Sequence, residues 1–159
     1  MTVGNDMNFL TMGCWAQKHP DAGSLVTLFM GGNGIGGGMV INGQLWTGAS
    51  GYCSEVGFLP VYERLNKGSL GLPPAEHISE LYARLIQIYA VTVNPHMMVL
   101  YRHPLLEGRL DEIRRLCASY LPSKAIPSIE LSYDYQQDYE KGLFTVAKSM
   151  GQAVSEGGL

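Results

Sequence analysis

The stretch that decides the fold runs from residue 25 to residue 59: LVTLFMGGNGIGGGMVINGQLWTGASGYCSEVGFL. It begins with an apolar run, Leu25–Met30, which is long enough for one buried strand. Six glycines then fall within eight positions, 31–38, before a second apolar run, Met39–Ile41. Asn42-Gly43 follows, a dipeptide favoured in two-residue hairpin turns because both residues accept positive φ angles. The pattern predicts a strand, a glycine turn, a second strand, a tight turn and a third strand.

The glycine cluster has two interpretations. Glycines at this density let the backbone take positive φ angles and bring its N–H groups close to a ligand, which is commonly phosphate. The same cluster is also typical of a bulged hairpin that binds nothing, and both interpretations stay open. Neither a Lys-Ser/Thr pair nor a helical pattern follows the glycines, so the segment is not a Walker loop or a Rossmann turn. A phosphate site here would be built from a β-hairpin.

The composition limits the class of protein. A length of 159 residues with 46% hydrophobic residues suits one domain with a real core, or half of a larger protein. The net charge of −3 offers no basic face for nucleic acid. The sequence has no run of 18 apolar residues to cross a membrane and no visible signal peptide. Three widely spaced cysteines (Cys14, Cys53 and Cys117) suit reduced thiols in the cytoplasm and lack the spacing of a zinc site.

The rest of the chain alternates helical and strand patterns. Periodicity predicts helices over 6–18, 75–92, 104–120 and 136–153, and short strands over 97–101 and 127–131. We expect the last helix to pack through Leu143, Ala147, Met150 and Val154. Alternating strands and helices predict a mixed α/β sheet with helices on both faces.

Glu55 stands alone among apolar neighbours. A carboxylate is costly to bury without a partner. We therefore expect Glu55 either to be exposed at a strand end or to point into a polar site.

Four motifs occur in a fixed order: Asn5–Asn8 (NDMN), Gly32–Gly38 (GNGIGGG), Ser54–Phe58 (SEVGF), and Asn94-Pro95 before an apolar strand. With this set the sequence resembles the C-terminal half of the ROK family, the bacterial repressors and sugar kinases of the actin-like, hexokinase-type ATPase superfamily. The likeness is strong over residues 3–59 and looser, by order of elements, beyond them. It implies an RNase H-like fold, with residues 1–159 forming one C-terminal domain and the N-terminal domain of a two-domain protein absent.

The resemblance also implies roles for particular residues. Asp6 would be the general base that takes the proton from a sugar hydroxyl as it attacks the γ-phosphoryl group, worth roughly 10²–10⁴ in rate. Asn5 and Glu55 would hydrogen-bond sugar hydroxyls. The phosphates of ATP would lie along four residues of the glycine motif, where positioning and charge stabilisation supply most of the catalysis; these residues are Gly32, Asn33, Gly34 and Gly36. ATP and Mg²⁺ would be the cofactors of a kinase.

The sequence departs from the family pattern at several positions. Phe58 stands where the family has a sugar-binding, often zinc-binding, histidine, which removes a hydrogen bond worth about 0.5–1.5 kcal/mol. The cysteine cluster that normally follows is absent, so we expect no zinc. Tyr101-Arg102 replaces the Gly-Gly that lets adenosine lie close to the backbone in kinases, and two bulky side chains there are expected to hinder nucleotide docking. Gly4 replaces the leading Glu of the first motif.

Three functional interpretations follow from the resemblance. The first is the sugar-binding C-terminal domain of a ROK-type transcriptional regulator or degenerate sugar kinase, which is inactive alone because the first phosphate motif and half the sugar site belong to the N-terminal domain. It would make no direct nucleic-acid contact, because no helix-turn-helix lies in these residues. The second is half of an ATP-dependent, glucokinase-like hexose kinase. The third is a structural or oligomerisation module without a ligand. Under the first two we expect a homodimer formed through an apolar helix face, and which sugar binds stays open.

Overall fold

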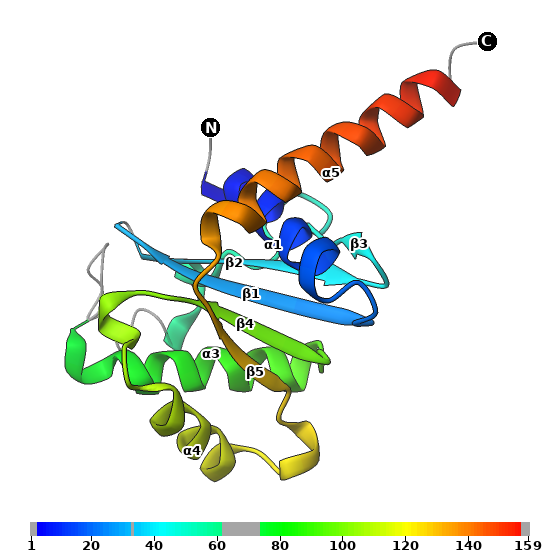
Figure 1. The fold of residues 1–159 in the computed structure, drawn as a ribbon. Helices are drawn as coiled ribbons and strands as arrows, with labels where there is room; N and C mark the ends of the chain where they lie inside the picture. Colours follow the sequence, from blue (N-terminus) through cyan, green and yellow to red (C-terminus); the bar gives the residue numbers. More distant parts are fainter. Residues whose placement is uncertain (1–2, 33, 62–73, 157–159) are drawn as a thin grey trace.

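The computed structural model describes residues 3–32, 34–61 and 74–156. In this part of the chain a five-stranded sheet lies between two layers of helices (Figure 1). The strands lie in the order β3 (Gln44–Leu45), β2 (Gly34–Ile41), β1 (Ser24–Gly31), β4 (Met97–Tyr101) and β5 (Ser128–Ser132). β1, β4 and β5 are parallel, whereas β2 is antiparallel to both β1 and β3.

Two helices cover each face of the sheet (Figure 1). α1 (Val3–Lys18) and α5 (Tyr135–Glu156) lie on one face, and α3 (Ile78–Thr92) and α4 (Leu110–Tyr120) lie on the other. The predicted mixed α/β sheet with helices on both faces is therefore confirmed. None of the helices in the described ranges is long and apolar enough to cross a membrane.

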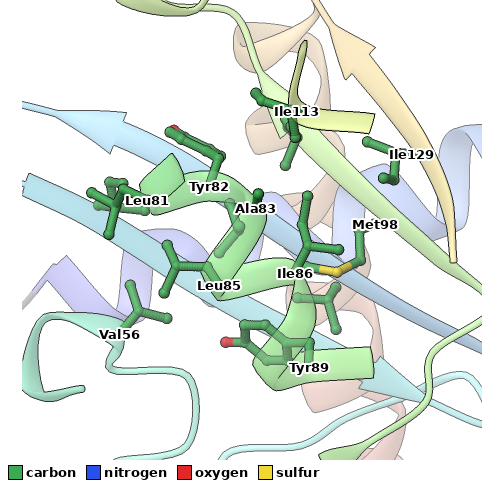
Figure 2. Packing of buried hydrophobic residues seen from close by; sticks show 14 of the residues in the cluster. Val56, Leu81, Tyr82, Ala83, Leu85, Ile86, Tyr89, Met98, Ile113 and Ile129 are labelled. Carbon is green, nitrogen blue, oxygen red and sulfur yellow. The ribbon is translucent and has the colours of Figure 1, made fainter. Parts of the chain in front are cut away.

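The core has one part on each face of the sheet. The larger part packs α3 and α4 against the strands, with Ile86 of α3 beside Met98 of β4 (Figure 2). The smaller part lies under α1 and includes Leu10 and Val99. Strand β1 is buried on both faces, which explains why its sequence is a continuous apolar run rather than an alternating one.

The glycine segment is mostly strand, so the predicted glycine turn is too long. Residues 34–38 pair with β1, from Gly31↔Gly34 to Thr27↔Gly38, and of the described glycines only Gly32 lies in the turn, while Asn33 lies outside the described residues. Glycine normally weakens a strand, but here it allows close approach of other groups. A Cβ on Gly38 would overlap the Thr11 side chain of α1.

The second hairpin forms as predicted. Asn42 and Gly43 join β2 to β3 with φ angles of 51° and 75°. Positive φ at both central residues is the requirement of a type I′ turn. Strand β4 likewise has the predicted bounds.

Two predicted helices begin later than expected. The segment 75–92 starts with a 3-10 turn, Ala75–His77, before α3. The segment 104–120 is broken, because the 3-10 turn Pro104–Leu106 is separated from α4 by Gly108, which has a φ of 72°. A left-handed residue cannot continue a right-handed helix.

The predicted packing face of the last helix is wrong. Leu143 and Met150 are 39% and 66% exposed, Ala147 is also exposed, and the side chain of Val154 lies outside the described residues. Instead α5 packs on α1 through its first turns, and its C-terminal half runs away from the body of the domain (Figure 1). The two helices approach so closely that neither contact leaves room for a side chain. A Cβ on Gly142 would overlap the Phe9 carbonyl, and one on Gly13 would overlap the Asp138 carbonyl.

Candidate functional site

Asp6 lies in the first turn of α1 and is half-buried. The Tyr139 hydroxyl of α5 donates a hydrogen bond to Asp6 Oδ1 at 3.3 Å. Desolvation and the charge of Asp6 raise the pKa of both Tyr135 and Tyr139, so the two phenols keep their protons at neutral pH. A carboxylate in the first turn of a helix is also favoured by the helix dipole. The carboxylate of Asp6 is thus oriented by a tyrosine that lies 133 residues away in the sequence.

A chain of contacting aromatic rings runs from this carboxylate to the ends of the strands. Tyr135 stacks on Tyr139 with ring centroids 6.2 Å apart, and Phe29 lies 4.6 Å from Tyr135. Phe29 and Tyr101 come from the carboxyl-terminal parts of β1 and β4. Ligand sites of open α/β sheets lie at this edge. The cluster therefore places Asp6 where the fold favours binding.

The four predicted phosphate-binding positions have different surroundings. Gly32 lies in the exposed turn of the β1–β2 hairpin, and Asn33 lies outside the described residues. Gly34 has a φ of 120°, which favours glycine, and pairs with Gly31, whereas Gly36 pairs with Phe29. The hairpin thus links the glycine motif to the aromatic cluster beside Asp6.

Glu55 lies on the other side of the sheet from α1. It directly precedes the 3-10 turn Val56–Phe58 and is half-buried. A pocket of about 300 Å³ separates this loop from the C-terminal end of α3, and Glu55 is one of its lining residues. No interaction among the described residues joins Glu55 to Asp6, and the side chain of Asn5 lies outside the description. The structure thus places the predicted sugar-binding carboxylates beside different helices.

The residues that depart from the family pattern lie in different parts of the structure and differ in exposure. Phe58 is 78% exposed and its ring lies 6.1 Å from that of Tyr52. Tyr101 is 1% exposed and donates a hydrogen bond to Asp138 at 2.6 Å, whereas Arg102 is exposed and lies over the ring of Tyr133. The expectation that two bulky side chains obstruct this strand end is corrected, because the Tyr101 ring turns into the core and only Arg102 remains at the surface.

Sequence reasoning missed a polar network under α5. Asp138 is fully buried and accepts hydrogen bonds from Tyr101 and Lys18. Lys18 also lies 3.1 Å from Asp134 and donates to Ser132 at 2.9 Å. The inward face of α5 carries Tyr135, Asp138, Tyr139 and Gly142, at the helical spacing i, i+3, i+4, i+7; Asp138 and Gly142 are buried and the two tyrosines are half-buried. That spacing is visible in the sequence, but a buried Asp is unusual, so the sequence pattern did not indicate this face as the packed one.

The described ranges contain no group of three or more His, Cys, Asp or Glu side chains that could hold a metal ion. The sequence-based expectations about ATP, Mg²⁺ and zinc stay predictions.

Known proteins resemble this chain in sequence and in fold. A family model of the ROK family matches residues 1–73. This confirms the resemblance to the ROK family. The matched segment contains the NDMN motif, the glycine motif and Glu55. No curated protein matches the sequence.

Solved ROK structures share the fold. A ROK hexokinase from Thermus thermophilus superimposes with a TM-score of 0.65 at 16% identity, covering 91% of this chain. A ROK family protein from Streptococcus pneumoniae in complex with sucrose gives 0.66 at 15% identity and covers 92%. A putative N-acetylmannosamine kinase from Listeria monocytogenes gives 0.66 at 17% identity and covers 91%. At these identities the likeness shows the fold alone, which is the predicted actin-like ATPase type. The chain spans 65% of the length of each of these structures.

Proposed function

We propose that this chain is the sugar-binding domain of a ROK-family transcriptional regulator or degenerate sugar kinase, and that it transfers no phosphate by itself. The observation that carries the proposal is the position of Asp6, in the first turn of α1 and hydrogen-bonded to Tyr139. A carboxylate accepts hydrogen bonds from sugar hydroxyls, and the neighbouring rings of Tyr135 and Tyr139 offer an apolar surface to a sugar ring.

Asn5 and Glu55 complete the proposed sugar contacts. Asn5 directly precedes Asp6 on α1, and its proposed hydrogen bond to a sugar hydroxyl rests on the resemblance to the ROK family. Glu55 lies beside α3, and its participation requires the sugar site to extend around the sheet edge or the loop 52–59 to move. Sugar affinities measured after separate substitution of Asp6 and Glu55 therefore show whether the site extends to both carboxylates.

A complete hexose kinase is the second candidate. In it Asp6 would act as the base, ATP with Mg²⁺ would be the cofactor, and the phosphates would lie along Gly32, Asn33, Gly34 and Gly36. The burial of Tyr101 favours this candidate, because it removes one of the two side chains expected to hinder a nucleotide. The first phosphate motif would have to come from residues that are not in this sequence.

Self-association is part of the proposal. α5 exposes Leu143 and Phe144 near its middle and Met150 in its C-terminal half, which runs away from the domain (Figure 1). Exposed apolar side chains in one region suit an interface between two copies of the chain. Light scattering should give the mass of a dimer, and a monomer at high concentration would contradict this part.

The deciding experiment measures sugar-induced thermal stabilisation with a panel of hexoses and amino sugars. We expect one sugar to raise the melting temperature of the wild-type chain and of Asp21→Asn, a control in which an exposed carboxylate is neutralised. Asp6→Asn should lose the effect. ADP release is measured on a longer protein that also supplies the first phosphate motif, and release that depends on both sugar and Asp6 would favour the kinase. Absence of stabilisation by every sugar would contradict both candidates.

A further inference from the structure

The two oxygens of the Asp6 carboxylate have different surroundings. The Tyr139 hydroxyl of α5 donates to Oδ1 at 3.3 Å, whereas no hydrogen bond to Oδ2 is found among the described residues. A carboxylate accepts hydrogen bonds on both oxygens. The protein therefore holds one oxygen of Asp6 and leaves the other available to a ligand.

The ring of Tyr139 is held by two other rings. It stacks on Tyr135 with planes 5° apart, and Phe9 of α1 meets it edge-on with the centroids 6.2 Å apart. Stacked and edge-on contacts between aromatic rings are both favourable, so they restrict the movement of this ring. The phenol is thus presented to Asp6 in a defined direction.

The position of α5 on α1 is fixed on both sides of Tyr139. Asp138, the preceding residue, lies 3.0 Å from the ammonium group of Lys18. Gly142, three residues later, approaches the Phe9 carbonyl so closely that a Cβ would overlap it. Both contacts lie within one helical turn of Tyr139, so they determine where its phenol lies.

We infer that Tyr139 is a positioning residue of the proposed sugar site, because its hydrogen bond holds Asp6 in the orientation in which Oδ2 accepts a hydrogen bond from one sugar hydroxyl. The inference rests on the proposed function, since it concerns the same carboxylate. A side chain that is already held loses less conformational freedom when a ligand binds, so the affinity is higher. The hydroxyl of Tyr139 acts through Asp6 and makes no hydrogen bond of its own to the sugar.

Calorimetry on the whole chain measures the contribution of the phenol to sugar affinity. The probe is the sugar among D-glucose, D-mannose, D-fructose and N-acetyl-D-glucosamine that most raises the melting temperature of the wild type. Tyr139→Phe keeps the ring and should bind this sugar about two- to tenfold more weakly. Tyr133→Phe is the matched control, because it removes a 68% exposed phenol just before α5 and should bind like the wild type.

Deoxy analogues of the same sugar separate positioning from other roles of Tyr139. In the wild type, removal of the hydroxyl that donates to Asp6 should cost more affinity than removal of any other hydroxyl. In Tyr139→Phe this cost should shrink, because the carboxylate is no longer held, while the costs at the other hydroxyls stay the same. A phenol that contacts another hydroxyl, or one that only ties the two helices together, would leave the cost unchanged.

NMR of tyrosine labelled at Cζ tests the hydrogen bond without a sugar. Desolvation raises the pKa of Tyr139, and the charge and hydrogen bond of Asp6 raise it further, so Asp6→Asn should lower this pKa. An unchanged pKa in Asp6→Asn would overturn the inference.

The sugar measurements distinguish failure of this inference from failure of the proposed function. Wild-type affinity in Tyr139→Phe, combined with its loss in Asp6→Asn, would overturn the inference and leave the sugar site at Asp6 in place. Equal costs of the missing hydroxyl in Tyr139→Phe and in the wild type would do the same. If none of the four sugars binds the wild type, the proposed site fails and the inference fails with it.

Discussion

The ammonium group of Lys18 lies 3.0 Å from the carboxylate of Asp138, so a cation at the end of α1 neutralises a fully buried anion on α5. Tyr101 donates to the same carboxylate oxygen at 2.6 Å. Lys18 also donates to Ser132 of β5. The Lys18–Asp138 ion pair therefore connects α1 and α5 to the parallel strands β4 and β5.

Replacing Lys18 by Met should strongly destabilise the fold. The substitution leaves Asp138 buried without its counter-charge, and removal of one partner of a buried ion pair costs about 3–5 kcal/mol. Urea unfolding monitored by circular dichroism measures the loss. Asp134→Asn is the matched control: this carboxylate also pairs with Lys18 but is 49% exposed, so its loss should cost less than about 1 kcal/mol. Equal effects of the two substitutions would contradict the assigned role of burial.

The two glycines of α5 should respond in opposite directions to alanine. Gly142→Ala puts a Cβ against the Phe9 carbonyl of α1 and forces the helices apart, which should destabilise by about 1–3 kcal/mol. Gly151→Ala meets nothing within 4 Å and should stabilise the helix by up to about 1 kcal/mol. Thermal unfolding of both variants checks the pair. Similar melting temperatures would show that α1 and α5 do not cross at Gly142.

Stability should fall in alkaline solution. Burial raises the pKa of the Cys14 thiol from 9.0 to about 12 and that of Cys117 from 9.0 to about 11. Both groups are protonated in the folded chain, so their contribution is complete below pH about 9 and is lost as the pH rises toward the folded values. Burial lowers the pKa of Lys18, but its hydrogen bonds to Asp138 and Asp134 outweigh this and hold the pKa above 10.5. The contribution of Lys18 to stability is therefore also lost as the pH rises.

The alkaline loss is measured by urea unfolding between pH 7 and 10.5. Each thiol should contribute a slope of about 1.4 kcal/mol per pH unit above its unfolded pKa. Cys117→Ala should reduce the slope by one thiol's share while lowering stability at all pH values. A free energy of unfolding that stays constant up to pH 10.5 would contradict the burial of these thiols.

Replacing Phe58 by His tests the proposed sugar site. Because Phe58 is 78% exposed, stability should change by less than about 0.5 kcal/mol. An imidazole there supplies a hydrogen bond to a sugar hydroxyl, so affinity for the stabilising sugar should rise about two- to tenfold by calorimetry. Phe58→Ala, which adds no polar group, serves as the control. Unchanged affinity in Phe58→His would place the sugar away from this turn.

The sequence by itself determined the order and type of most elements. The Asn42-Gly43 turn and strand β4 could be predicted because turn chemistry and apolar runs act over a few residues. The motifs likewise located Asp6 and Glu55 and indicated the family-like fold. These are properties of neighbouring residues, which a sequence displays directly.

Only the tertiary structure decided how distant residues meet. Gly38 belongs to a strand rather than a turn because it pairs with Thr27 of β1, and it has no side chain because Thr11 of α1 occupies the space that one would need. Lys18 pairs with Asp138, and Tyr139 orients Asp6, across more than a hundred residues. Such pairs form because burying a charge or a hydroxyl without a partner is costly, and the fold selects which partner is within reach.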